Sequence, residues 1–126
     1  MKNKISKKIL IVEDDVTLSD SLKDKFESEK FDVLVAQNGE EGLEIVKKEK
    51  PDLVLIDILL PKMDGISMAK EIHELNIGTL MMFLTNLNDA NHISEAVSVD
   101  VTDYLVKSDW NINDIVTRVK QKLGVK

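Results

Sequence analysis

The sequence predicts an α/β protein of the (βα)5 type, a three-layer sandwich in which helices cover both faces of a parallel five-stranded sheet. Three observations support this fold class. Five short apolar runs recur along the chain, amphipathic stretches separate them, and polar side chains stand at the ends of four of the runs. Strands of a parallel sheet are buried on both faces, so they read as nearly continuous apolar segments, as these runs do.

The expected strands are residues 8–12, 31–36, 52–57, 79–85 and 103–107. Their apolar residues are nearly continuous and do not alternate with polar ones, which favours strands with no solvent-facing side. Met81 and Met82 lie inside the fourth run and are expected to fill the core.

Apolar residues at three- and four-residue spacing predict helices between and after the strands. Asp15 and Asn38 are expected to cap the first two helices, Asn111 to cap the last, and Gly124 to end it. The apolar stripes are Leu18, Leu22 and Phe26; Leu43 and Val46; Ile66, Ala69, Ile72 and Leu75; Ala90, Ile93, Ala96 and Val97; and Ile112, Ile115, Val116, Val119 and Leu123.

The composition excludes several classes of function. A length of 126 residues fits one domain over 1–126, with a basic lead-in at 1–7 and no output domain expected after the last helix. A net charge of −6 argues against direct nucleic-acid binding, and no segment is long enough to span a membrane. The absence of cysteine rules out thiol chemistry and favours a cytoplasmic location. The single arginine, Arg118, gives little basis for a salt-bridged dimer face, so we expect a monomer or a weak homodimer.

Two of the expected strands end in acids. Glu13, Asp14 and Asp15 follow the first strand, and Asp57 closes the third. The carboxyl ends of parallel strands meet at one rim of the sheet, where open α/β sheets bind their ligands. Acids at this rim would repel phosphate and attract a hard divalent cation, for which Mg²⁺ (or Mn²⁺) is the natural choice.

Thr85 and Lys107 end the fourth and fifth expected strands, at the same rim. With a cation present, Asp57 can act as a nucleophile toward a phosphoryl group, while the Thr85 hydroxyl and the Lys107 ammonium hold its oxygens. Each residue alone has a plainer explanation as a cap, a strand former or a surface lysine. Their convergence on one rim favours the functional interpretation.

The chain resembles the receiver domain of two-component response regulators over essentially its whole length. The segments that carry the resemblance are ILIVEDD at 9–15, LVLIDILLPKMDG at 53–65, FLT at 83–85 and DYLVK at 103–107. The resemblance implies a flavodoxin-like sandwich with strand order 2-1-3-4-5.

The resemblance also implies a role for each residue at the rim. Asp57 would be the phosphoacceptor, and a sensor histidine kinase or a phosphotransfer protein would supply the phosphoryl group from a phosphohistidine. Asp14, Asp57 and the main-chain carbonyl of Leu59 would contact Mg²⁺, and Glu13 would act mostly through a metal-bound water. The chain would catalyse its own phosphorylation and dephosphorylation without being a conventional enzyme.

A conformational switch is implied as well. On phosphorylation Thr85 would move toward the phosphoryl group and Tyr104 would turn inward. The surface formed by the fourth helix, the fifth strand and the last helix would then change its preference for a downstream protein.

Several residues depart from the family pattern. The family usually has proline after the lysine, in a cis peptide bond, whereas this chain has Ser108. A cis bond before a non-proline residue costs about 2.5–4 kcal/mol, so Lys107-Ser108 is either trans or strained. Asn86 stands next to Thr85 where the family usually has a small residue, and we expect it to narrow access to the rim for the phosphodonor or water. Leu59 and Leu87 are apolar, which predicts exclusion of water and a long phosphoryl lifetime.

Three other functions compete with a phosphorylated switch. A phosphatase or phosphotransferase of the haloacid-dehalogenase type would need an acid two residues after Asp57, where Leu59 stands. A flavin- or nucleotide-binding module is disfavoured by the acids of the first loop. A docking module that works without phosphorylation stays open, supported by Ser108 and Asn86.

Overall fold

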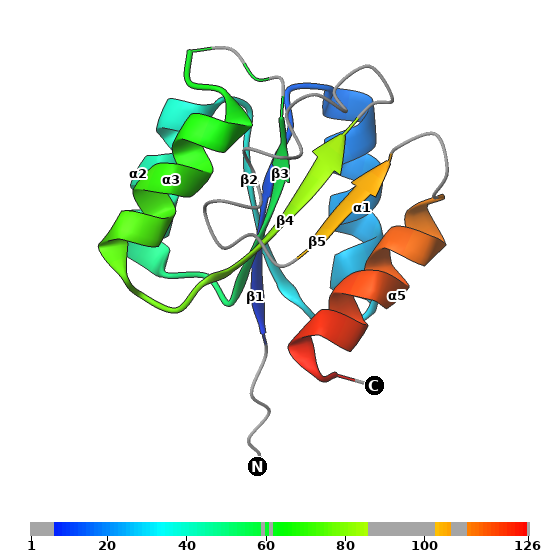
Figure 1. Ribbon diagram of the computed structural model, residues 1–126. Coiled ribbons are helices and arrows are strands. Elements are labelled where there is room, and N and C mark those ends of the chain that lie inside the picture. The colour runs from blue at the N-terminus through cyan, green and yellow to red at the C-terminus, as the bar shows by residue number, and fades with distance from the viewer. Residues whose placement is uncertain (1–6, 59, 61, 86–102, 107–110, 126) are drawn as a thin grey trace.

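The computed structural model describes residues 7–58, 60, 62–85, 103–106 and 111–125, and at positions 85, 103, 104 and 106 it describes the main chain alone. Its strands form one parallel sheet in the order β2-β1-β3-β4-β5 (Figure 1). The strands are β1 (Lys8–Val12), β2 (Asp32–Ala36), β3 (Leu53–Asp57), β4 (Leu80–Thr85) and β5 (Asp103–Val106). The predicted fold class and strand order are confirmed.

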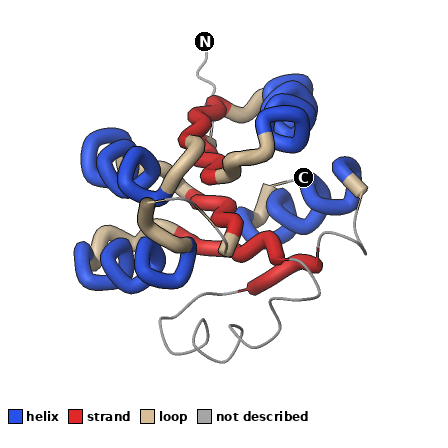
Figure 2. The backbone as a smooth tube through the Cα atoms, turned by 90° about the horizontal axis from the view of Figure 1, so that it is seen from above, coloured by secondary structure: helices blue, strands red, loops and turns tan. Residues whose placement is uncertain are grey.

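Helices cover both faces of this sheet. Seen from above, α2 (Gly39–Glu49) and α3 (Gly65–Leu75) lie on one side, and α1 (Val16–Ser28) and α5 (Ile112–Leu123) lie on the other (Figure 2). The helix expected around 90–97 falls outside the described residues.

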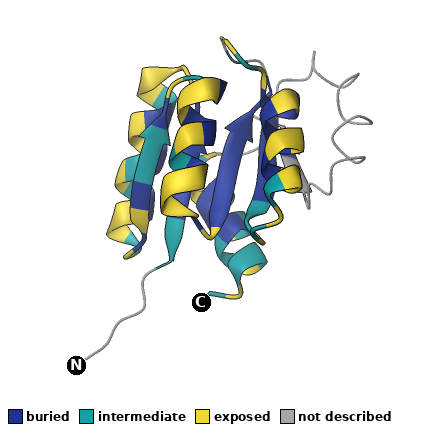
Figure 3. Cartoon of the chain, turned by 90° about the vertical axis from the view of Figure 1, so that its left-hand side faces the viewer, coloured by how far each residue is buried: buried dark blue, intermediate teal, exposed yellow. Residues whose placement is uncertain are grey.

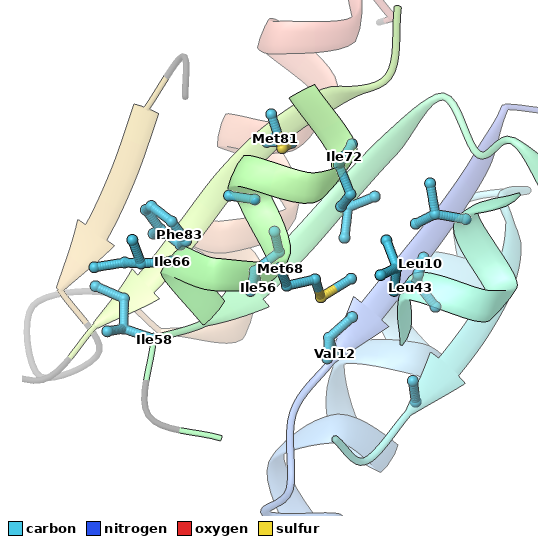
Figure 4. Close-up of a cluster of buried hydrophobic side chains, with 14 residues drawn as sticks. Leu10, Val12, Leu43, Ile56, Ile58, Ile66, Met68, Ile72, Met81 and Phe83 are labelled. Carbon is cyan, nitrogen blue, oxygen red and sulfur yellow. The ribbon is translucent and has the colours of Figure 1, made fainter. Parts of the chain in front are cut away.

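Side chains of each central strand alternate between two separate cores. Leu10 and Val12 of β1 pack under α2 and α3, whereas Ile9 and Ile11 pack under α1 and α5. The first of these cores also contains Met68, Ile72 and Phe83, drawn in Figure 4. Burial on both faces explains the continuous apolar runs of the central strands, whereas the edge strand β2 is only partly buried. Figure 3 shows this difference between strands, and it shows exposed residues on the outer faces of the helices.

Three strands begin one residue later than the sequence predicted. Phe31 precedes β2, because its main-chain N–H donates to the carbonyl of Phe26 and the two rings pack edge to face at 5.5 Å. Asp52 precedes β3, and its carboxylate accepts from the main-chain N–H of Lys8 at 2.7 Å. Thr79 precedes β4, with its hydroxyl donating to the carbonyl of Pro51 at 2.9 Å. The last residue predicted for the fifth strand, Lys107, lies outside the described residues.

The predicted helix ends are confirmed. The side chains of Asp15, Asn38 and Asn111 each accept from a main-chain N–H in the first turn of their helix. Gly124 follows α5 in the left-handed conformation, at φ 72°. Met81 and Met82 are buried, as expected for core residues.

Candidate functional site

The candidate site lies at the carboxyl edge of the sheet, where the strand order reverses between β1 and β3. Glu13 directly follows β1, and Asp57 is the last residue of β3. β1 and β3 are hydrogen-bonded neighbours, with Val12 opposite Ile56. The adjacent strands therefore deliver their acids side by side.

Three predicted site residues meet here. One carboxylate oxygen from each of Glu13, Asp14 and Asp57 lies within 4.8 Å of the other two. Glu13 is fully buried, Asp57 is 4% exposed, and Asp14 is exposed. The cluster therefore has two acids embedded in the protein and one at the surface, which leaves it open to solvent on the Asp14 side.

Glu13 is held in place by hydrogen bonds to main-chain groups on both sides of it. Its own N–H donates to the carbonyl of Ala36 at the end of β2, at 3.0 Å. Its Oε2 accepts from the N–H of Asp15, also at 3.0 Å. Asp15 in turn caps α1 by accepting from Leu18 at 3.2 Å, so it is a structural residue, as predicted.

The electrostatics of the cluster favour a cation. Carboxylates this close repel one another, and a buried carboxylate is costly unless it is paired or coordinates a metal. A set of carboxylate oxygens open to water on one side matches the ligands that Mg²⁺ prefers, since this ion usually binds one or two carboxylates and keeps several waters. The donor set therefore fits the predicted divalent cation.

Asp57 stands on a rigid support. All five residues of β3 are buried between β1 and β4. The main-chain N–H of the next residue, Ile58, donates to the carbonyl of Leu84, and the N–H of Gly65 returns to the carbonyl of Ile58 at 2.8 Å. The loop after Asp57 is thus closed at its base by a hydrogen bond.

The other predicted residues are only partly described. Thr85 is the last residue of β4 and lies opposite Val106, so its main chain is at the same edge as Asp57. Tyr104 lies within β5, opposite Phe83. The side chains of both lie outside the description, as do the whole of Lys107 and Leu59 and the departures at Asn86, Leu87 and Ser108.

A family model described as the response regulator receiver domain matches residues 9–120. The chain belongs to this family. Receiver domains act in phosphorylation-dependent two-component signalling, where they interact with histidine kinases and downstream effectors, and they typically bind Mg²⁺ through acidic residues.

Curated relatives agree with this assignment. The alkaline phosphatase synthesis transcriptional regulatory protein PhoP of Bacillus subtilis is 31% identical over 116 residues, 92% of this chain and 48% of that protein. The transcriptional regulatory protein CrdR of Helicobacter pylori is 32% identical over 93% of this chain and 55% of that protein. The receiver domain thus spans about half the length of these two relatives. Sporulation initiation phosphotransferase F of Bacillus subtilis is 32% identical over 97% of this chain and 98% of that protein.

Solved structures agree as well. A CheY-like receiver domain protein from Methanospirillum hungatei superposes with a TM-score of 0.89 at 31% identity, covering 95% of both chains. The receiver domain of the Francisella response regulator 1452 gives 0.84 at 30% identity, over 94% of this chain and 98% of that one. In the part of this receiver domain that the structure describes, no helix is long and apolar enough to cross a membrane.

Two glycines next to the site were not singled out from the sequence. Gly65 ends one of the segments that carry the family resemblance, but the sequence assigns a role neither to it nor to Gly39. A Cβ added at Gly65 would overlap the main-chain carbonyl of Asp57, and one at Gly39 would overlap the carbonyl of Met63. Each of these glycines is the first residue of a helix. Glycine has no strong preference for that position, so the sequence alone did not point to them.

Proposed function

We propose that this receiver domain is a phosphorylation-activated switch in which Asp57 accepts a phosphoryl group from the phosphohistidine of a sensor kinase or a phosphotransfer protein. The observation that carries the proposal is the cluster of Glu13, Asp14 and Asp57, within 4.8 Å of one another at the carboxyl edge of the sheet. Membership of the receiver family supports the same function.

The transfer is a simple displacement at phosphorus. A carboxylate oxygen of Asp57 attacks the phosphorus atom, the new O–P bond forms, and the P–N bond to the donor imidazole breaks. The imidazole nitrogen keeps the bonding electron pair and, with the other ring nitrogen protonated, leaves as neutral histidine. The product is an acyl phosphate, which water later hydrolyses to restore the carboxylate.

The chain's contribution to this reaction is position and charge. β3 holds Asp57 at a fixed place at the rim, which lowers the entropic cost of bringing nucleophile and phosphorus together. Glu13 and Asp14 would hold a divalent cation, which when bound neutralises negative charge on the phosphoryl oxygens. The assignment of Thr85 and Lys107 to those oxygens, and of the Leu59 carbonyl to the cation, follows from the family resemblance.

The output of the switch would be a change in protein binding. Phosphorylation adds roughly two negative charges at the rim, and Thr85 and Tyr104 would respond to them. The surface around β5 and α5 would then exchange between two packed states with different affinities for a downstream protein.

The decisive test is chemical. The protein is incubated with Mg²⁺ and a small acyl phosphate, and the intact mass is measured for wild type, Asp57→Asn and Asp64→Asn. We expect wild type and Asp64→Asn to gain one phosphoryl group and Asp57→Asn to gain none. Asp64 is a matched control, since it is an aspartate near the rim that caps α3 and asparagine caps equally well.

Other outcomes would reject the proposal. A phosphoryl group on Asp57→Asn would mean that another residue is the acceptor. No gain in wild type would favour the phosphorylation-independent docking module, and a gain that persists in excess chelator would exclude a role for the divalent cation.

A further inference from the structure

The first turn of α2 touches the loop that follows the candidate phosphoacceptor. Gly39, the first residue of α2, is buried, and a Cβ built on it would overlap the carbonyl oxygen of Met63 and lie 2.8 Å from its carbonyl carbon. These atoms are main chain, so a side chain at position 39 could not be accommodated by a rotamer change. The absence of a side chain lets the loop before α3 rest directly on the α2 backbone.

The first turn of α2, which makes this contact, is held by hydrogen bonds. The Asn38 side chain accepts from the N–H of Glu41 at 2.8 Å, and the Glu41 side chain accepts from the N–H of Gln37 at 2.9 Å. The main-chain carbonyl of Asn38 accepts from Gly42 at 3.0 Å. These hydrogen bonds hold the residues on both sides of Gly39, so the main chain at Gly39 is fixed.

The segment that leads into α2 is also hydrogen-bonded to Glu13. The carbonyl of Ala36, three residues before Gly39, accepts from the main-chain N–H of Glu13 at 3.0 Å. The segment from Ala36 to Gly39 therefore runs from the residue that bonds Glu13 to the residue that supports Met63. This segment therefore links Glu13 with the loop that follows Asp57.

The far end of the loop returns to Asp57. Asp64 caps α3 through the N–H of Ser67 at 2.8 Å. Gly65 packs so closely that an added Cβ would overlap the carbonyl of Asp57 and lie 2.9 Å from Ile58 Cα. A shift of Met63 would thus be passed within two residues to the main chain that carries Asp57.

We propose that Gly39 is a positioning residue for cation binding, through which the capped start of α2 acts as a strut that fixes the β3–α3 loop relative to Glu13. The inference rests on the proposed function for the identity of the cation. Gly39 itself does not touch the cation. It would act through Met63 and Gly65 on one side and through Ala36 on the other.

Two alanine substitutions in the same helix test whether Gly39 positions the cation site. Gly39→Ala forces Met63 and the loop outward. Gly42→Ala is the matched control, because Gly42 is also buried in α2 but faces the side chains of Met68 and Val12, with an added Cβ 2.8 Å from Met68 Cε. Isothermal titration with Mg²⁺ gives the Kd, and urea unfolding of the metal-free protein gives the stability of each variant.

We expect Gly39→Ala to raise the Mg²⁺ Kd by about tenfold, the lower end of what loss of an outer-shell support costs a metal site. Gly42→Ala should leave the Kd at the wild-type value whatever it does to stability. If Gly39 only stabilises the fold, Gly39→Ala should change the urea midpoint and leave the Mg²⁺ Kd unchanged. An unchanged Kd in Gly39→Ala, or an equal rise in Gly42→Ala, would overturn the inference.

A second variant covers the case in which Gly39→Ala does not fold. Asn38→Ala removes the cap of α2 without adding a clash, and it should raise the Mg²⁺ Kd in the same direction; an unchanged Kd would reject the strut. If wild type binds Mg²⁺ but gains no phosphoryl group, the proposed function is rejected. The Mg²⁺ Kd values of the variants would still test whether Gly39 positions the cation site. Wild type that binds no Mg²⁺ would overturn the strut.

Discussion

Glu13 and Asp15 are acids two residues apart in one loop, and the structure gives them different tasks. The Asp15 side chain caps α1 by accepting from Leu18, and Asp15 is exposed. Glu13 is buried, and one of its carboxylate oxygens lies within 4.8 Å of oxygens of Asp14 and Asp57, where the proposed cation would bind. The hydrogen bond of 3.0 Å between them runs from the main-chain N–H of Asp15 to Glu13 Oε2, so a change confined to the Asp15 side chain does not remove it.

Replacing these two acids by their amides separates cation binding from helix capping. Glu13→Gln keeps the shape of the side chain and removes one negative charge, so we expect the Mg²⁺ Kd to rise by about tenfold or more. Ligand at 100 times its Kd stabilises a folded protein by about 2.7 kcal/mol, and a tenfold higher Kd removes about half of that. The check is thermal unfolding with and without Mg²⁺.

Asp15→Asn is the control for this pair. Asparagine caps a helix as well as aspartate does, so the variant should keep both its stability and its response to Mg²⁺. If Glu13→Gln responds to Mg²⁺ as strongly as wild type does, Glu13 has no part in binding the cation.

The acids of the site could be predicted from sequence because their position depends on one rule. A residue that follows a buried parallel strand lies at the carboxyl edge of the sheet, so Glu13, Asp14 and Asp57 were placed together correctly. Gly39 and Gly65 could not be predicted in this way. The value of a glycine in close packing depends on the backbone that faces it, here Met63 and Asp57, and that neighbour is known only from the tertiary fold.

At the scale of the element, the helix ends were the most predictable feature. Polar residues that cap a helix act on their own first turn, so the prediction needs no knowledge of the fold. Strand starts were less accurate. Phe31 and Thr79 look like strand residues, but Phe31 hydrogen-bonds to the end of α1 and Thr79 to the carbonyl of Pro51, so both precede their strands. Those partners, Phe26 and Pro51, come from a neighbouring helix and a neighbouring loop.

The cap of α5 is expected to contribute measurably to stability. Asn111 accepts from the N–H of Asp114 at 2.8 Å, and the Asp114 side chain accepts from the N–H of Asn111 at 3.4 Å. Asn111→Ala should lower the free energy of unfolding by about 1 kcal/mol, because one main-chain donor loses its partner. Asn111→Asp should keep the wild-type value.

Urea unfolding at neutral pH measures both variants, with an unchanged slope showing that the unfolded state is the same. An alanine variant as stable as wild type would mean that water replaces the cap at no cost.

At the scale of the whole molecule, ion pairs between elements distant in the sequence lie on both faces of the sheet. On one face Lys8, at the start of β1, binds Glu49 at the end of α2 at 2.9 Å. On the other, Lys120 of α5 binds Glu29 at the end of α1 at 2.7 Å, and Lys25 lies 3.6 Å from the same carboxylate. Glu29 and Lys120 are 91 residues apart in the sequence, so their pair stabilises the packing of α1 with α5 and not a single helix.

The stability of this packing should depend on pH through Glu29. The hydrogen bond from Lys120 and its positive charge hold the pKa of Glu29 below its ordinary value of 4.5, with a smaller contribution from Lys25 and against an opposing effect of burial. A carboxyl whose pKa is lower in the folded state stabilises the fold at pH above the unfolded value. That stabilisation is lost as the pH falls through the folded value.

Glu29→Gln removes this titration, so wild type should exceed the variant in unfolding free energy at neutral pH. That advantage should shrink as the pH falls below the ordinary value of 4.5 and disappear once the pH has passed the lower folded value. Urea unfolding of both proteins across the acid range measures the difference. Glu27→Gln is the matched control, because its pair with Lys23 is an exposed contact of 3.2 Å within α1. Such pairs contribute little, so that variant should track wild type at every pH. A gap for Glu29→Gln that is the same at neutral and acid pH would show that lost packing, and not the charge of Glu29, stabilises the contact between α1 and α5.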